Sequence, residues 1–262
     1  MKPGSETIIS SQQGLDNSPG SRMKTMIIGK YRIIGGAILG LCAIPIAAPA
    51  LGHVDTSWDG LVQVESKKMD TVYLEPYADF SGYRKVMFDK PEITFKKNWR
   101  RNQNRSALSL GGRVNERQAQ RILEGARDLL DEAFRKQFSE AGYQVVTAPG
   151  PDVMRITLEI FDLDVTAPEN NSPGISYTYV QESGKATLAL EVRDSETGDL
   201  LGRTVDKGRT GSRGGDFILA NNVSTAADFN RLFSRWARIC AAGLNELKTL
   251  SPIDEAGQHK KD

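Results

Sequence analysis

Few residues in this chain have the types and the spacing that catalysis or metal binding requires. The 262 residues include only two histidines, His53 and His259, and two cysteines, Cys42 and Cys240. An acid–base centre or a zinc site needs several such groups close together, and no G-x-S-x-G, H-E-x-x-H or C-x-x-C motif occurs. We therefore predict no catalytic residues, no metal ligands and no cofactor, and we expect that the chain is not an enzyme.

The D-x-D pair Asp162 and Asp164 is the best candidate for chemistry. Residues i and i+2 of a strand lie on one face, so the two carboxylates could hold a divalent cation or serve as acid and base. A carboxylate-dependent hydrolase is therefore one hypothesis for the function. We favour the other interpretation, in which the two aspartates lie at the end of a strand and face solvent.

Positive charge gathers around Trp99. Residues 96–105 hold five basic side chains, which are Lys96, Lys97, Arg100, Arg101 and Arg105. Basic residues beside an aromatic side chain can bind nucleic acid or an acidic membrane surface. We expect residues 96–113 to form a loop, and taken alone the segment favours an ordinary solvated loop. The alternative, which we put to the test, is that residues 96–105 contact lipid headgroups, an anionic envelope polymer or a partner protein, with Trp99 as an amphipathic anchor.

A second basic segment is the glycine-rich stretch 207–215. There Lys207, Arg209 and Arg213 could hold an anion together with exposed backbone N–H groups. The stretch lacks the Gly-Lys-Ser/Thr step of a phosphate-binding loop. We favour a flexible connection between a hairpin and a helix, with anion binding as the alternative.

The apolar run at 33–52 indicates export. It carries no charge, follows Lys24, Lys30 and Arg32, and ends in small residues. This is the pattern of a secretory signal peptide, which we place at 23–52. The protein is therefore expected in the periplasm or associated with the outer envelope.

The signal peptide is predicted to be cleaved between Gly52 and His53, with cleavage after Ala48-Pro49-Ala50 as a close second. One alternative is that residues 33–52 stay as an anchor in the inner membrane, because twenty uncharged residues can just span a bilayer. The other is lipidation at Cys42. Leu41 disfavours it, because the position before a lipidated cysteine is normally small.

Composition and charge exclude several classes of protein. Hydrophobic residues make up 39% and charged residues 26% of the chain, which excludes a polytopic membrane protein and a disordered one. Removal of residues 1–52 takes away five basic and two acidic side chains, so the mature chain has 29 basic and 31 acidic groups. That balance argues against a nucleic-acid partner. Cys240 remains as a single thiol, so no intramolecular disulfide can form.

Strand patterns dominate the mature chain. Residues 71–75 and 143–147 are predicted strands, and Pro91 interrupts the β-rich segment 83–95, as at an edge strand or a bulge. Two hairpins follow later in the chain. The first joins 175–182 to 185–194 through Ser183-Gly184, and the second joins that strand to 199–206 through the turn 194–198.

The strand that ends near residue 165 is predicted to carry a β-bulge. Met154, Ile156, Leu158 and Ile160 alternate with polar residues, as in a half-buried strand. After Ile160 the apolar set becomes Phe161, Leu163 and Val165. One side-chain step is skipped, which predicts a bulge near Phe161 and Asp162.

Two long helices show an apolar stripe. The first begins at the N-cap Asn115, with Gln118 in capping-box spacing, and ends at Ala141 before Gly142. The second begins near Ser224. Its predicted stripe consists of Phe229, Leu232, Phe233, Trp236, Cys240, Leu244 and Leu247. Gly243 lies on the same face and is expected to allow close approach to the sheet.

The order of these elements predicts an α+β fold. We expect a mostly antiparallel mixed sheet with the two long amphipathic helices packed on one face. The first helix can form a right-handed parallel crossover between the strands that flank it. The predicted organisation is a polar extension from a misassigned start at 1–22, a signal peptide at 23–52, an irregular segment at 53–70, a single domain at 71–250 and a polar tail at 251–262.

Three stretches together resemble a known family. They are TVYLEPYADFSGYRKVMFDKPEI, AGYQVVTAPGPDVMRITLEIFDLD and KATLALEVRDSETGDLLGRTVD. In this order, with the two helices between and after them, they resemble the bacterial domain-of-unknown-function family 3313, whose members are described as lipoproteins. The resemblance covers about residues 71–250 and implies no activity or catalytic residues.

The sequence thus supports three hypotheses for function. We favour an exported, noncatalytic cell-envelope protein that acts through contacts with an envelope protein or an anionic envelope surface, with at most peripheral membrane association. The alternative is a periplasmic binding module for a small anionic or lipidic ligand. The carboxylate-dependent hydrolase ranks third.

Overall fold

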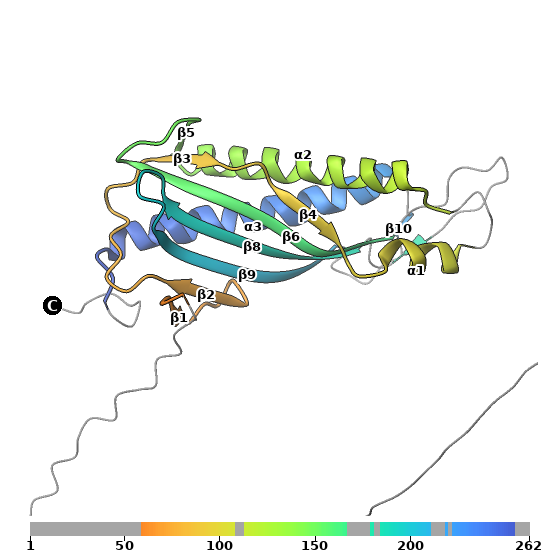
Figure 1. The fold of residues 1–262 in the computed structure, drawn as a ribbon, viewed down its shortest axis with the longest axis horizontal. Coiled ribbons are helices and arrows are strands. Elements are labelled where there is room, and N and C mark those ends of the chain that lie inside the picture. The colour runs from red at the N-terminus through yellow and green to blue at the C-terminus, as the bar shows by residue number, and fades with distance from the viewer. Residues whose placement is uncertain are drawn as a thin grey trace, which may run out of the picture. The chain divides into compact units, whose positions relative to one another are not determined.

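Three long strands form the centre of the sheet. In the computed structural model, which describes residues 59–107, 113–166, 179–180, 184–210, 218–219 and 222–254, every second side chain of these strands is buried. The strands pair antiparallel in the order β6, β8, β9 (Figure 1). Their bounds are β6 (Val153–Val165), β8 (Gly184–Asp194) and β9 (Leu200–Thr210).

Shorter strands extend this centre on both sides. The sheet order is β1-β2-β9-β8-β6-β3-β5, and β4 also pairs with β6. The pairs of β3 and β4 with β6, and of β3 with β5, are parallel, whereas β1, β2 and β9 are antiparallel. The bounds are β1 (Val62–Val64), β2 (Thr71–Leu74), β3 (Lys85–Phe88), β4 (Glu92–Phe95) and β5 (Gln144–Val145).

The proline break and the bulge are confirmed. Pro91 separates β3 from β4, which both lie along β6. The register between β6 and β8 shifts between Phe161 and Asp164, and Asp162 has a left-handed φ of 54°. The extra residue keeps Leu163 buried, as the phase change in the sequence predicts.

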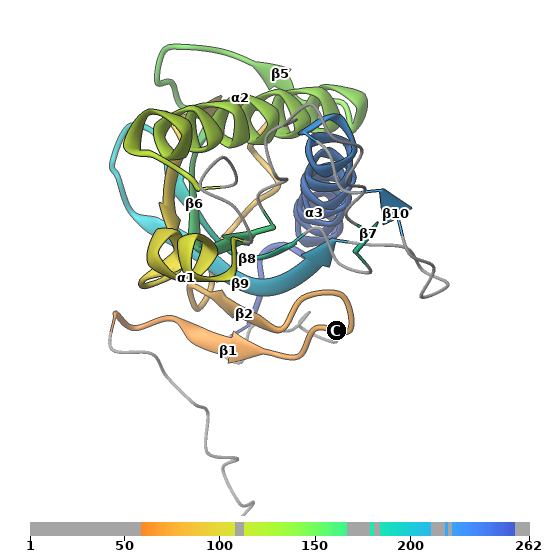
Figure 2. The same ribbon diagram turned by 90° about the vertical axis from the view of Figure 1, so that its right-hand side faces the viewer.

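Two long helices cover the concave side of the curled sheet (Figure 2). They are α2 (Glu116–Glu140) and α3 (Asn222–Leu250). The capping box of Asn115 and Gln118 is present, and Gly142 follows α2 with a φ of 94°. The apolar stripes of both helices enter one core with the inner face of the sheet. The α+β fold with a mostly antiparallel mixed sheet is therefore confirmed.

The first predicted hairpin is wrong. Both edges of β8 are occupied, by β6 on one side and by β9 on the other, so no edge is left for residues 175–182. Within that segment β7 (Tyr179–Val180) instead pairs with β10 (Ile218–Leu219). The second hairpin, between β8 and β9, is confirmed.

The ends of the predicted domain are more ordered than the sequence indicates. β1 lies within 53–70, a segment predicted as irregular apart from its apolar residues Leu61, Val62 and Val64. Ile253, in the predicted polar tail, is buried, and its N–H donates to the Ala78 carbonyl at 3.2 Å. Among the residues described, none of the helices is both long and apolar enough to cross a bilayer. The predicted leader, with Cys42 and the Gly52–His53 cleavage site, lies outside the described residues.

Candidate functional site

The segment around Trp99 is a helix, so the predicted loop is wrong over α1 (Trp99–Ser106). Only Trp99 in this helix is buried, and one buried residue leaves no apolar period for the sequence to show. Its ring stacks on Phe95 with centroids 3.9 Å apart, and its Nε1 donates a 2.9 Å hydrogen bond to the Val165 carbonyl. Trp99 therefore holds α1 against β4 and β6 and cannot serve as a surface anchor.

The five predicted basic side chains of this segment are exposed but differ in their partners. Lys96 Nζ lies 3.0 Å from Asp164 Oδ2, a hydrogen bond that raises the pKa of Lys96. Arg100 pairs with Glu116 at the start of α2. Lys97, Arg101 and Arg105 form no ion pair with any side chain in the described ranges. Of the five predicted basic residues, Lys97, Arg101 and Arg105 thus carry the charge that no described acidic side chain neutralises.

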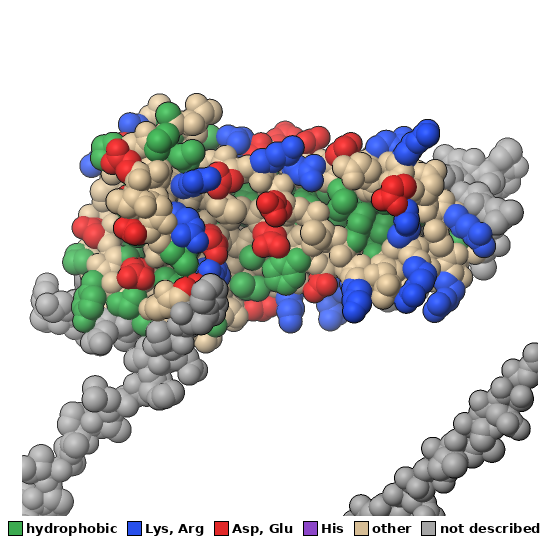
Figure 3. All heavy atoms as spheres, viewed as in Figure 1, with side chains coloured by type: hydrophobic (Ala, Val, Ile, Leu, Met, Phe, Trp, Pro, Cys, Tyr) green, Lys and Arg blue, Asp and Glu red, His purple; other side chains and the backbone are tan. Residues whose placement is uncertain are grey.

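The start of α2 enlarges this positive surface. The Asn104 side chain bonds both the N–H and the carbonyl of Val114, which places α1 beside the first turn of α2. Figure 3 shows Lys and Arg gathered over these two elements. We call this set the basic surface, and it consists of Lys96, Lys97, Arg100, Arg101, Arg105, Arg113, Arg117 and Arg121.

The basic set predicted from residues 96–105 leaves out Arg113, which precedes α2, and Arg117 and Arg121, which lie in the first two turns of α2. Residues 96–121 hold eight basic and one acidic side chain, so a charge count that continued past residue 105 would have found them. Positive side chains in the first turns of a helix oppose its dipole. Arg117 therefore does not stabilise the start of α2. A role in surface contacts explains better why a positive side chain stands at this position.

The D-x-D pair does not form a carboxylate site. Asp162 sits exposed on the bulge, while Asp164 is paired with Lys96, because the bulge breaks the i, i+2 relationship. Within the described ranges, no three His, Cys, Asp or Glu side chains lie close enough to hold a metal ion.

The predicted anion loop is also wrong in its described part. Lys207 and Arg209 belong to strand β9 and point outward, and Arg213 lies outside the described residues. The backbone N–H of Lys207 donates to Asp70 Oδ2 at 3.0 Å, so it is not available to a ligand. Gly208 between them faces the core.

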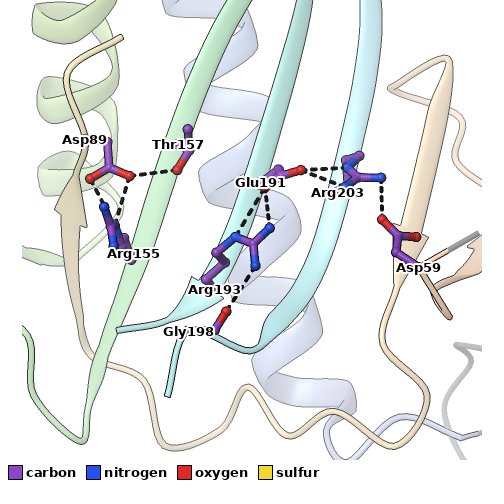
Figure 4. Close-up of polar contacts among 8 residues, drawn as sticks. All are labelled: Asp59, Asp89, Arg155, Thr157, Glu191, Arg193, Gly198 and Arg203. Atoms are coloured by element: carbon purple, nitrogen blue, oxygen red, sulfur yellow. Dashed lines mark hydrogen bonds and ion pairs between the residues drawn. The ribbon is translucent and has the colours of Figure 1, made fainter. Parts of the chain in front are cut away.

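The outer face of the sheet carries charges that neutralise one another (Figure 4). Glu191 accepts hydrogen bonds from Arg193 at 2.8 Å and from Arg203 at 2.9 Å, and Arg203 also pairs with Asp59 at 2.6 Å. Burial alone would raise the pKa of Glu191, but the two guanidinium groups outweigh it and lower the pKa.

A second cluster on this face is built in the same way. Asp89 accepts hydrogen bonds from Arg155 at 2.9 Å and from Thr157 at 2.8 Å. Burial again opposes the shift, and these bonds lower the pKa of Asp89. Both clusters join neighbouring strands, which is a structural role.

A cavity of about 500 Å³ lies between the C-terminal half of α3 and the inner face of β2 and β9, next to the β1–β2 turn. We call it the α3 cavity. Its apolar lining includes Val64, Met69, Val72, Leu74, Phe80, Leu190, Val192, Ile239, Leu244, Leu247 and Leu250. Cys240 also lines it, and burial raises the pKa of this thiol to about 12, so the thiol stays protonated and unreactive.

Gly243 corrects one sequence expectation. It lies on the α3 stripe, where we expected close approach to the sheet, but a Cβ at this position would meet nothing within 4 Å. Gly243 lines the α3 cavity instead.

Comparison with known proteins gives a family and a set of distant folds. The family model "Protein of unknown function (DUF3313)" matches residues 54–239. No curated protein matches the sequence. Among solved structures, a PelC dodecamer from Paraburkholderia phytofirmans is 11% identical, with 63% of this chain and 95% of that chain covered and a TM-score of 0.29.

Two further structures are similarly distant. Lipoprotein GNA1162 from Neisseria meningitidis is 13% identical, with 63% of this chain and 98% of that chain covered and a TM-score of 0.25. A DUF4136 family protein from Bacteroides thetaiotaomicron is 9% identical, with 68% and 95% covered and a TM-score of 0.30. Likeness at this level carries no argument about function.

Proposed function

Because the chain belongs to the DUF3313 family, whose function is unknown, we propose a role from its own geometry. It is an exported, noncatalytic cell-envelope protein that contacts an anionic membrane surface through the basic surface. The observation that carries this proposal is the exposure of Lys97, Arg101 and Arg105 without an ion pair to any described residue.

The position of the charges supports a contact role over mere solubility. A surface that only needs to be soluble mixes both signs of charge, whereas residues 96–121 carry one acidic side chain among eight basic ones. Arg100, Arg101 and Arg117 lie in the first turns of α1 and α2. There they cost helix stability through the dipole.

The burial of Trp99 favours lipid headgroups over a protein partner. Protein interfaces usually have an aromatic or apolar centre, but Tyr77 is the one exposed large hydrophobic side chain among the described residues. Attraction to anionic headgroups needs no such centre and contributes about 1 kcal/mol for each nearby Lys or Arg. The contact is therefore peripheral, reversible and sensitive to salt.

Export supports the location of this contact. The uncharged run at 33–52 after Lys24, Lys30 and Arg32 has the pattern of a signal peptide. Cys240 is the single thiol of the mature chain, and it is buried. The mature chain therefore forms no internal disulfide outside the cytoplasm. The core of a domain of this size is sufficient without one.

Fractionation of cells tests the proposal. In the α1 triple variant, Lys97, Arg101 and Arg105 are replaced by Gln. We expect this variant to fold normally, since none of the three side chains is buried. It should shift from the envelope-membrane fraction to the soluble periplasmic fraction after lysis at low salt.

A matched variant controls for net charge. The control triple variant replaces Lys90, Arg235 and Arg238 by Gln. These side chains are also exposed; Lys90 lies between β3 and β4, and the two arginines lie on α3. It loses the same three positive charges and should fractionate as the unchanged protein does. Equal fractionation of both variants would contradict a role for the basic surface.

A further inference from the structure

Small residues on both walls create the α3 cavity. On the helix side, the apolar stripe of α3 is interrupted by Cys240 and Gly243. On the sheet side, Gly202 and Thr204 of β9 face the helix, with Leu74 packed against Gly202. A Cβ at Gly243 would meet nothing within 4 Å, so a side chain there would fill empty space.

The polar groups in the body of the cavity are already satisfied. Thr204 Oγ1 donates a 2.9 Å hydrogen bond to the Thr71 carbonyl, and the Cys240 thiol is protonated. A ligand with polar groups along its length would find no partners there and would lose the hydrogen bonds it makes to water. The body of the cavity therefore fits a hydrocarbon chain.

Four charged residues line the cavity. Glu65, Lys68 and Glu246 are exposed and mark its mouth, and Arg203 is neutralised by Glu191 and Asp59. Lys68, on the β1–β2 turn, lies 3.9 Å from Glu246 of α3, and their side chains are 60% and 63% exposed. Among the described contacts, Lys68 Nζ donates no hydrogen bond. The Lys68 ammonium group has three N–H donors, and its ion pair with Glu246 is long and exposed to solvent. It can therefore donate hydrogen bonds to a ligand carboxylate in place of Glu246.

We propose that the α3 cavity binds a single-chain fatty acid, with the acyl chain along Gly243 and Leu247 and the carboxylate beside Lys68. The cavity volume of about 500 Å³ lies within the range of about 300–1,000 Å³ that small-molecule sites occupy. This site lies between α3 and β2, and it does not depend on the basic surface or on the proposed membrane contact.

Filling the cavity tests the proposal. The mature protein is titrated with cis-parinaric acid, a fatty acid that fluoresces in an apolar site, and palmitate is then added as competitor. Gly243→Leu places a side chain in the acyl site. We expect saturable binding by the unchanged protein and an affinity loss of at least about tenfold in the variant, because one methylene group of misfit already costs that much.

A glycine in α2 provides the matched control. Gly125 is helical and exposed, and a Cβ there also meets nothing within 4 Å. Gly125→Leu changes helix propensity as Gly243→Leu does, but leaves the cavity open, so it should bind the probe normally. Both variants should unfold at the same temperature as the unchanged protein or a higher one, which separates loss of the site from loss of the fold.

The carboxylate assignment has its own test. Because the probe is itself a fatty acid, its affinity for Lys68→Gln is measured first and each competitor's Kd is corrected for it. Lys68→Gln should then raise the Kd of palmitate and leave the Kd of hexadecanol unchanged. The proposal is overturned if the unchanged protein does not bind the probe, or if Gly243→Leu binds it as tightly as Gly125→Leu does. Equal displacement by palmitate and by hexadecyltrimethylammonium would overturn the role of Lys68.

Discussion

The indole Nε1 of Trp236 donates a 2.6 Å hydrogen bond to Oδ2 of Asp206, and both side chains are buried. Oδ1 of the same carboxylate accepts the backbone N–H of Asp70 at 2.9 Å. One buried carboxylate thus joins α3, β9 and the start of β2.

The first prediction concerns this junction. Trp236→Ala should lower the free energy of unfolding by about 3–5 kcal/mol, because it empties the centre of the core. Asp206→Ala should cost about 1–3 kcal/mol for each N–H left unpaired. Trp236→Phe keeps most of the volume but leaves Oδ2 of Asp206 without its indole donor, so it should cost less than Trp236→Ala but still destabilise the protein. Urea unfolding followed by circular dichroism measures all three, and a different order would contradict the junction.

The second prediction concerns Gly208 on β9. A Cβ at this position would lie 2.5 Å from the Trp236 ring and 2.6 Å from Leu232. Gly208→Ala should therefore destabilise the protein by about 1–3 kcal/mol through overpacking. Gly125→Ala, on the open face of α2, should instead stabilise it by up to about 1 kcal/mol. If both substitutions stabilise the protein, α3 does not lie against β9 as described.

Trp99 and Trp236, which are both buried, show what the sequence could predict. Trp236 repeats in phase with Leu232 and Phe233 along a long helix, so its burial could be predicted from spacing alone. Trp99 has no such neighbours in α1, and its partner, the Val165 carbonyl, is 66 residues away in the chain. Contacts of that separation have no local signal, so its burial could not be predicted.

The same distinction applies to the strands and to the sites. The bulge near Asp162 could be predicted because it shifts a local alternation. The pairing of β7 with β10 depends on which edges of β8 are free, which is a property of the whole sheet. The positive charge of 96–105 was visible in the sequence. The α3 cavity was not, because Gly202 and Gly243 come from distant elements.

The third prediction concerns the stability of the fold at acidic pH. The folded pKa values of Asp89 and Glu191 lie below their ordinary values of 3.8 and 4.5. Carboxylates of this kind contribute stability above their ordinary pKa and lose it as the pH falls through the folded pKa. The free energy of unfolding should therefore be flat above about pH 5 and fall below the ordinary carboxyl values.

Arg155→Gln tests the cause of the acid dependence. Without this guanidinium, Asp89 keeps its burial but loses its main partner, so its folded pKa should rise. The variant should be less stable near neutral pH and should lose less stability on acidification. Parallel pH profiles for the variant and the unchanged protein would show that this pair does not contribute.

The fourth prediction concerns export. Sequencing the amino terminus of the protein recovered from cells should show His53 as the first residue, because Gly52 ends the signal-peptide pattern. A lipid-modified start at Cys42 would show anchoring by acylation. An uncleaved leader would show that residues 33–52 remain in the inner membrane.

The fifth prediction concerns membrane contact. The mature protein should sediment with vesicles of phosphatidylglycerol and phosphatidylcholine but not with vesicles of phosphatidylcholine alone. Binding should weaken as salt rises, because the Debye length shrinks to about 8 Å at physiological ionic strength. A protein held by apolar insertion would instead stay bound at high salt.

The most direct test of the basic surface compares the two triple variants in this vesicle assay. At about 1 kcal/mol for each charge, loss of Lys97, Arg101 and Arg105 should weaken binding to phosphatidylglycerol vesicles by roughly 100-fold. The control triple variant, which loses the same net charge elsewhere, should bind almost as the unchanged protein does. Equal loss of binding by both variants would mean that net charge alone governs the contact, and unchanged binding by the α1 triple variant would contradict the proposed function.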